Sequence, residues 1–158
     1  MEGTQERQSF STFRKTYALL ANPGTDTVFL SFRMNPDPKN GKHFPKETQK
    51  TFSLGQLELL EFVKVMDSLL KGKSVKKDWI HDPGAGTENA GAEIKTLSLG
   101  QTEDGSIMIR LHTKTKEEQH SYTIVFNKLE AMQLNLMLKL WFYEMITGTK
   151  VGFSYNWI

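Results

Sequence analysis

The sequence of 158 residues contains no cysteine. Disulfide bonds, thiolate zinc sites and a thiol nucleophile are therefore excluded, and the composition fits a reducing compartment. No apolar run approaches the roughly 20 residues needed to span a bilayer. Residues 1–9 are polar and carry two glutamates, unlike a signal peptide or a transit peptide. We therefore expect a protein of the cytoplasm, nucleoid or nucleus that is neither secreted nor bound to a membrane.

A large excess of one charge is also missing, because 20 lysines and arginines stand against 18 acidic residues. A nucleic-acid binder would then depend on where its cations lie and not on its net charge. The four histidines show no metal-binding spacing, and no glycine-rich string matches a phosphate loop or a dinucleotide fingerprint. We predict a protein that is not an enzyme and has no catalytic residues, metal or cofactor.

What the sequence does contain is an internal repeat. Residues 13–72 run from strand-like segments into a long helical segment, and residues 93–148 do so again. A short string, Lys15-Thr16 and Lys95-Thr96, opens both copies. A duplicated unit of sheet and helix favours a pseudo-symmetric binding platform over an enzyme cleft. We predict a tail over residues 1–11, a first unit over 12–72, a linker over 73–91 and a second unit over 92–158.

The predicted strands, helix caps and terminal glycines follow the same order in the two units. Strands are predicted over residues 13–20, 27–34, 48–52, 93–99, 106–114 and 119–126. Ser53 with Gln56 predicts the start of the first helix, and Asn127 with Glu130 predicts the start of the second. Glycines at 72 and 148 end them. The apolar tail over residues 151–158 is expected to pack on the body as a strand or extended segment.

Alternation within the strands assigns their faces. Aligning residues 28–33 with 107–112 places three apolar pairs on one side: Val28/Ile107, Leu30/Ile109 and Phe32/Leu111. We predict an α+β fold of two repeated antiparallel-sheet-plus-helix units, each sheet backed by one helix, forming one pseudo-symmetric body. The other face of each sheet then meets solvent or a partner.

Cations and flat side chains gather on that other face, as a single-stranded nucleic acid requires. The predicted contacts are Lys15, Tyr17, Phe29, Arg33, Arg110, His112 and Lys114. Further phosphate contacts are predicted at Lys39, Lys42 and Lys46 in the long loop and at Lys73, Lys76 and Lys77 in the linker. Ordinary solvated strand residues would give the same alternation, and the recurrence in both units is what favours the binding interpretation.

One string carries a resemblance to known proteins. Residues 50–60, Lys-Thr-Phe-Ser-Leu-Gly-Gln-Leu-Glu-Leu-Leu, resemble the last strand and helix of the positive-cofactor-four family of single-stranded-DNA-binding coactivators. Two such units in one chain resemble the related Whirly proteins. The Lys-Gly-Lys-Ala-Ala-Leu strand motif of Whirly proteins is absent, since residues 71–75 (Lys-Gly-Lys-Ser-Val) follow a helix. The resemblance implies sequence-tolerant single-strand binding and oligomers built through helix packing.

The second helix is apolar nearly all round, so it must be buried on more than one side. We predict that it packs against the first helix and also pairs two chains, with anchors at Trp141, Phe142 and Tyr143. The expected function is non-catalytic binding of single-stranded DNA in replication, recombination or transcription. Two alternatives stay open, single-stranded RNA binding and a protein-assembly module without nucleic acid.

Overall fold

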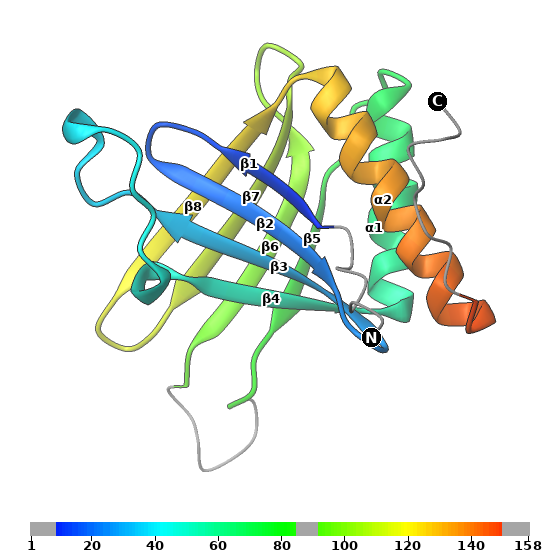
Figure 1. The fold of residues 1–158 in the computed structure, drawn as a ribbon, viewed down its shortest axis with the longest axis horizontal. Helices are drawn as coiled ribbons and strands as arrows, with labels where there is room; N and C mark the ends of the chain where they lie inside the picture. The colour runs from blue at the N-terminus through cyan, green and yellow to red at the C-terminus, as the bar shows by residue number, and fades with distance from the viewer. Residues whose placement is uncertain (1–8, 85–91, 150–158) are drawn as a thin grey trace, which may run out of the picture.

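Two four-stranded antiparallel sheets and two long helices make up the described part of the chain, residues 9–84 and 92–149 of a computed structural model (Figure 1). Sheet A contains, in spatial order, β1 (Phe10–Phe13), β2 (Tyr17–Pro23), β3 (Thr27–Met34) and β4 (Lys50–Gly55). Sheet B contains β5 (Lys77–His81), β6 (Ile94–Gln101), β7 (Ile107–Lys114) and β8 (Gln119–Phe126). Helix α1 (Gln56–Leu70) follows sheet A, and α2 (Lys128–Thr147) follows sheet B. Two short 3-10 turns, η1 (Pro38–Asn40) and η2 (Lys46–Thr48), lie in the β3–β4 connection.

The predicted duplication is confirmed, because each half contains a four-stranded antiparallel sheet followed by a helix. The three apolar pairs of β3 and β7 are all buried, and the residues between them face outward. The shared Lys-Thr string, however, is not structurally equivalent. Lys15 lies in the turn between β1 and β2, whereas Lys95 lies within β6 opposite His81 and Thr113. In register, Tyr17 is the counterpart of Lys95.

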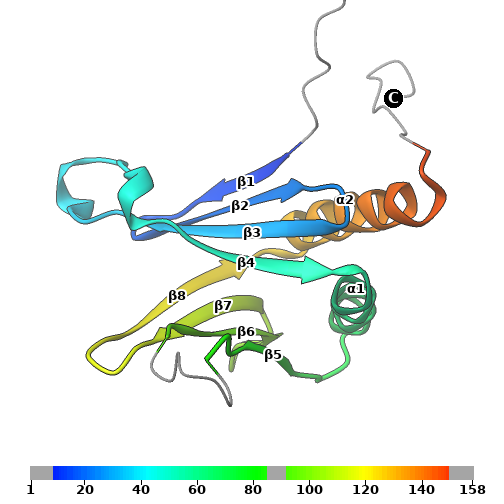
Figure 2. The ribbon, with the colours of Figure 1, turned by 90° about the horizontal axis from the view of Figure 1, so that it is seen from below.

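The two sheets cover each other, as the two layers of Figure 2 show. Between the layers, the ring centroids of Phe32 and Tyr122 lie 6.3 Å apart, and Phe52 stacks on His81 at 3.9 Å. The prediction that each sheet is backed by its own helix is therefore wrong. Helices α1 and α2 pack on each other at one end of the sheets (Figures 1 and 2). Alternation identifies an apolar face but not its partner, and two apolar sheet faces of similar size bury each other efficiently.

Asn127 caps α2 as predicted, accepting a hydrogen bond of 2.8 Å from the Glu130 N–H. The predicted cap of α1 at Ser53 is wrong, because β4 continues to Gly55 and the helix begins one residue later. The Glu58 carboxylate accepts from the Gly55 N–H at 3.2 Å. This is one half of the capping box of α2, because glycine has no side chain that could accept from the Glu58 N–H. Both helices end at glycines with positive φ, as predicted.

Two short edge strands were missed. The predicted strand over 13–20 is broken by a turn in which the Arg14 N–H bonds to the Tyr17 oxygen, and β1 begins at Phe10 inside the predicted tail. The predicted linker over 73–91 contains β5. Strands of four or five residues with few buried side chains give little periodicity to detect. The predicted apolar tail over residues 151–158 lies outside the described residues.

Candidate nucleic-acid interface

The solvent sides of the two sheets point away from each other, because their inner sides are pressed together (Figure 2). We call them outer face A, which carries Phe29, Ser31 and Arg33 of β3, and outer face B, which carries Arg110, His112 and Lys114 of β7. The predicted contact residues therefore do not form one patch in one chain. They are divided between two surfaces on opposite sides of the molecule.

Outer face B is cationic, as predicted. Arg110 is exposed, and its Nε donates to the hydroxyl of Thr123 on β8 at 3.1 Å. The Nδ1 of His112 lies 2.8 Å from the Ser121 hydroxyl on the same strand. Lys114 is exposed at the end of β7. Neighbouring hydroxyls thus hold two of the three polar heads in fixed positions on the sheet.

The linker lysines divide into two groups. The side chain of Lys76 crosses outer face B, since a Cβ built on Gly100 would lie 3.2 Å from its Cγ. Glycine at position 100 leaves the room for this crossing. Lys73 is exposed nearby, and its carbonyl accepts from Gln101. Lys77 instead belongs to the inner side of sheet B and forms an ion pair of 3.0 Å with Glu61, so its charge is already partnered.

Outer face A has fewer charges and more aromatic surface. Phe29 is 40% exposed, and its ring lies over the turn at Gly24, where a Cβ would approach the ring to 2.8 Å. Arg33 donates from Nε to the Gln49 side chain at 2.8 Å. A hydroxyl pair of Ser31 and Thr51 lies between them at 2.9 Å.

Two predicted contacts of the first unit lie elsewhere. Tyr17 pairs with Met34 on the inner side of sheet A, and its ring meets Tyr122 at 5.6 Å and His120 at 6.0 Å. Its predicted place beside Phe29 is wrong, because the turn after β1 shifts the register of β2 relative to the assumed single strand. Lys15 is exposed in that turn. The loop lysines at 39, 42 and 46 are also exposed.

An aromatic pair on outer face A was not predicted. Phe13 at the end of β1 is 45% exposed, and its ring centroid lies 5.5 Å from that of Phe44 in the β3–β4 connection. The alternation of β1 would have placed Phe13 on this face if the strand break had been recognised. The contact with Phe44, 31 residues away, has no local signal.

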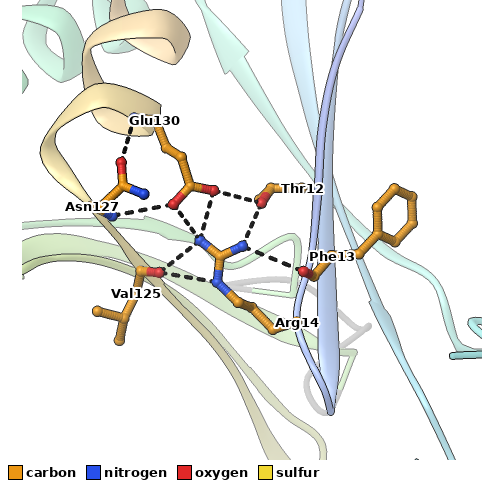
Figure 3. Close-up of polar contacts among 6 residues, drawn as sticks. All are labelled: Thr12, Phe13, Arg14, Val125, Asn127 and Glu130. Atoms are coloured by element: carbon orange, nitrogen blue, oxygen red, sulfur yellow. Dashed lines mark hydrogen bonds and ion pairs between the residues drawn. The ribbon is translucent and has the colours of Figure 1, made fainter. Parts of the chain in front are cut away.

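A polar cluster anchors β1 to the start of α2 (Figure 3). The Arg14 guanidinium contacts the Glu130 carboxylate at 2.8 Å and donates to the Val125 carbonyl and the Thr12 hydroxyl. Burial alone would raise the pKa of Glu130, but hydrogen bonds from Arg14, the Asn127 backbone and Thr12 hold that pKa below its ordinary value. Arg14 is consequently committed within the chain and is not free to meet a phosphate.

The other half of the molecule has the counterpart of this cluster. In register, His81 is the counterpart of Arg14, and Glu58 is the counterpart of Glu130. The Nε2 of His81 lies 2.9 Å from the Glu58 carboxylate. Each helix-capping glutamate therefore reaches the first strand of the opposite unit, and the two sheets are tied together at both edges.

Helix α2 presents apolar side chains both inward and outward. Trp141 is only 3% exposed and packs in the core of its own chain, so its predicted role as an exposed anchor is wrong. Phe142 is half-buried and Tyr143 is exposed. The outward side chains form what we call the α2 stripe, at Leu129, Met132, Leu136, Tyr143 and Ile146. Their spacing of three, four, seven and three residues keeps them on one side of the helix.

The inward side of α2 is tied to α1 by polar contacts. The carboxylate of Asp67 accepts from the Asn135 amide at 2.7 Å and from Lys139 at 2.8 Å. Burial would raise the pKa of Asp67, but these two hydrogen bonds and the charge of Lys139 hold it below its ordinary value. Among residues 9–84 and 92–149, no group of three metal-ligating side chains comes together, and no helix is long and apolar enough to cross a membrane.

Comparison with known proteins decides the family. The sequence profile described as Whirly transcription factor matches residues 5–135, which is most of the chain. The chain belongs to the Whirly family. No curated protein sequence is similar enough to be matched to this Whirly protein by sequence alone.

Solved structures share the Whirly fold at low sequence identity. WHY3 from Arabidopsis thaliana is 18% identical and superposes with a TM-score of 0.73, covering 92% of each chain. The plant transcriptional regulator PBF-2 is also 18% identical, with a TM-score of 0.71 and 90% of each chain covered. A guide-RNA-binding protein complex bound to a guide RNA is 12% identical, with a TM-score of 0.65, covering 90% of this chain and 94% of the other. The repeated sheet-and-helix fold predicted from the sequence is thereby confirmed.

Proposed function

We propose that this Whirly protein binds single-stranded DNA without strong sequence preference, in transcription, replication or recombination. The observation that carries the proposal is the open, cationic outer face B. Arg110, His112, Lys114 and Lys76 meet on one sheet surface, and within the described residues no helix covers that surface. Side chains anchored on a rigid sheet can neutralise phosphates without first losing much conformational freedom.

Outer face A supports the same function in another way. Unpaired bases expose flat apolar surfaces, and an aromatic ring on a sheet accepts them by stacking regardless of their sequence. Phe29 offers such a ring, and Arg33 adds a cation farther along the same strand. A family of transcription factors is consistent with DNA as the ligand.

Single-stranded RNA is the second candidate. The guide-RNA-binding complex, which shares this fold, was solved with RNA bound. Both ligands carry phosphates and unpaired bases, so neither outer face distinguishes them by chemistry already described. A comparison of oligo-dT with oligo-rU separates the two candidates.

We also propose that copies of this chain associate through the α2 stripe. Leu136 at the centre of the stripe is 62% exposed, and no residue in the described part of the same chain buries it. Several exposed apolar side chains along one side of a helix are typical of a protein interface. An oligomer would place several copies of each outer face along one strand and raise the affinity through multivalency.

The proposed function is tested by titrating labelled oligo-dT into the protein at two salt concentrations, with oligo-rU and duplex DNA as competitors. The affinity should fall as salt rises, with a logarithmic slope of about −0.7 for each neutralised phosphate of a single strand. Oligo-dT should compete better than the duplex. A protein that gives no signal at low salt is an assembly module and not a nucleic-acid binder.

A further inference from the structure

The Phe13–Phe44 pair is the least explained aromatic feature of outer face A. Phe13 is 45% exposed although it belongs to a β-strand next to the core, and Phe44 meets it at 5.5 Å with the rings tilted by 49°. The two rings form an apolar pair that is partly exposed to solvent. The Phe13 ring has no role in the packing of the two sheets, which takes place on the opposite side of β1.

The loop that carries Phe44 is held in place by a buried amide. Asn35 is only 2% exposed, and its Nδ2 donates to the Gly41 carbonyl at 2.7 Å and to the Lys15 carbonyl at 3.3 Å. Its backbone N–H donates to the Thr16 carbonyl at 2.7 Å. One side chain therefore fastens the connection to the β1–β2 turn. Phe44 is positioned before any ligand arrives, which lowers the entropic cost of binding.

The strand that carries Phe13 is also fixed by polar contacts. The Arg14 cluster fastens the end of β1 to Val125 and Glu130, and the Phe13 ring extends from the opposite side of the strand (Figure 3). The two rings thus come from segments that are far apart in sequence and are each fastened by a partly or fully buried polar side chain. Such fixed rings are suited to stacking, which requires a flat surface in a defined place.

Exposed cations belong to the segments that carry the two rings. The β3–β4 connection carries exposed lysines at 39, 42 and 46 against two acidic residues, and Lys15 is exposed in the adjacent turn. Arg33 lies in the same row of sheet A as Phe13, with Ala18 between them, so about 10 Å separates their backbones. These cations supply the positive charge that phosphates next to a stacked base require.

We propose that Phe13 and Phe44 form a stacking site for one unpaired base of a bound single strand, flanked by phosphate contacts from Arg33 and the loop lysines. The site deepens the proposed function and depends on it. The site is separate from outer face B. It adds a stacking surface for a base, which the equivalent position of sheet B does not have. There the counterpart of Phe13 is Ile80, an exposed aliphatic residue.

The experiment compares oligo-dT with an abasic oligonucleotide of the same length, which has the sugar-phosphate chain but no bases. Wild-type protein should prefer oligo-dT, since only it can stack. Phe13→Leu and Phe44→Leu keep an apolar side chain but remove the ring. Each should weaken oligo-dT binding by roughly 5-fold to 150-fold, the range for loss of a stacked base, and should leave binding of the abasic chain unchanged. Phe13→Tyr should keep the preference.

Ile80→Ala is the matched control, because it removes an exposed apolar side chain at the equivalent place of sheet B. It should leave both affinities unchanged, and thermal unfolding should show that every variant is folded. If the leucine variants keep the wild-type ratio of the two affinities, the stacking site is wrong while the proposed function survives. If wild-type protein binds neither oligonucleotide, the proposed function itself is wrong.

Discussion

The two halves of this chain share one fold but present different side chains on their outer faces. Sheet A presents aromatic rings at Phe13 and Phe29 on its outer face, whereas sheet B presents the cationic row of β7. The edge contact of one half uses the planar guanidinium of Arg14, and that of the other half uses the imidazole ring of His81. The inward-facing residues of β3 and β7 are apolar in both halves because they form the shared core, while their outward-facing residues differ.

The helices differ in the same way. Among large apolar side chains of α1, only Leu57 is exposed, whereas α2 carries the whole α2 stripe. The apolar side of α1 is therefore buried almost entirely within the chain. Helix α2 keeps an apolar side that the same chain does not bury. We expect the second half to direct assembly and both halves to contact the ligand.

The largest expected effect is on assembly. Leu136→Asp places a charge at the centre of the α2 stripe, where burial of an unpaired carboxylate costs several kcal/mol. The oligomer should dissociate into monomers, as measured by analytical ultracentrifugation. Leu57→Asp is the control, because it places the same charge on an exposed leucine of α1, and it should leave the mass unchanged. An unchanged mass for Leu136→Asp would remove the α2 stripe from the interface.

The aromatic outer face is tested next. Phe29→Ala removes a stacking surface, which is worth about 1–3 kcal/mol for each base. The affinity for oligo-dT should fall by a similar factor at low and high salt, because no charge is lost. The measurement is a fluorescence anisotropy titration at several salt concentrations. A change in the salt slope would show that the substitution altered phosphate contacts instead.

The cationic outer face should show the opposite signature. Arg110→Ala removes one phosphate contact, so the salt slope should become shallower by about 0.7 and the affinity at low salt should fall by roughly tenfold. The protein should remain folded, since Arg110 is exposed and bonds only to its strand neighbours. Unchanged binding would exclude this residue from the site.

A smaller effect is expected on stability. Arg14→Ala leaves Glu130 and the Val125 carbonyl without their shared partner, and should lower the free energy of unfolding by about 1–2 kcal/mol. Urea denaturation at neutral pH measures it. Lys15→Ala next to it should change stability by less than about 0.5 kcal/mol, because its side chain is exposed. Equal losses in both variants would contradict a specific role for the Arg14 cluster.

The smallest expected effect is on the stability of the protein at acidic pH. The folded protein holds the pKa of Glu130 below its ordinary value, so the carboxylate stabilises the fold above the unfolded pKa of about 4.3. This contribution is lost as the pH falls through the lower folded pKa. Unfolding free energies between pH 5 and pH 3 should therefore fall less steeply in Glu130→Gln than in wild type. An identical slope would mean that Glu130 does not contribute.

Local sequence pattern was sufficient to predict a residue's place in the fold wherever that place depended on near neighbours in sequence. The alternation of β3 and β7, the Asn127–Glu130 cap and the terminal glycines of both helices were all predicted correctly. The prediction for Tyr17 failed because one tight turn after β1 changed which side of sheet A it faces. The site predictions for the exposed residues of β7 followed directly from alternation.

Residue order alone specified two repeated units, their inward-facing residues and a second helix with too much apolar surface for one partner, because each is written in spacings of two to seven residues. Only the tertiary structure decided that the sheets cover each other and turn their outer faces apart. It also brought Arg14 to Glu130 and Phe13 to Phe44. Those contacts join segments that are distant along the chain. They form only because the two apolar sheet faces pack on each other, and the periodicity of a strand does not show what its apolar face packs against.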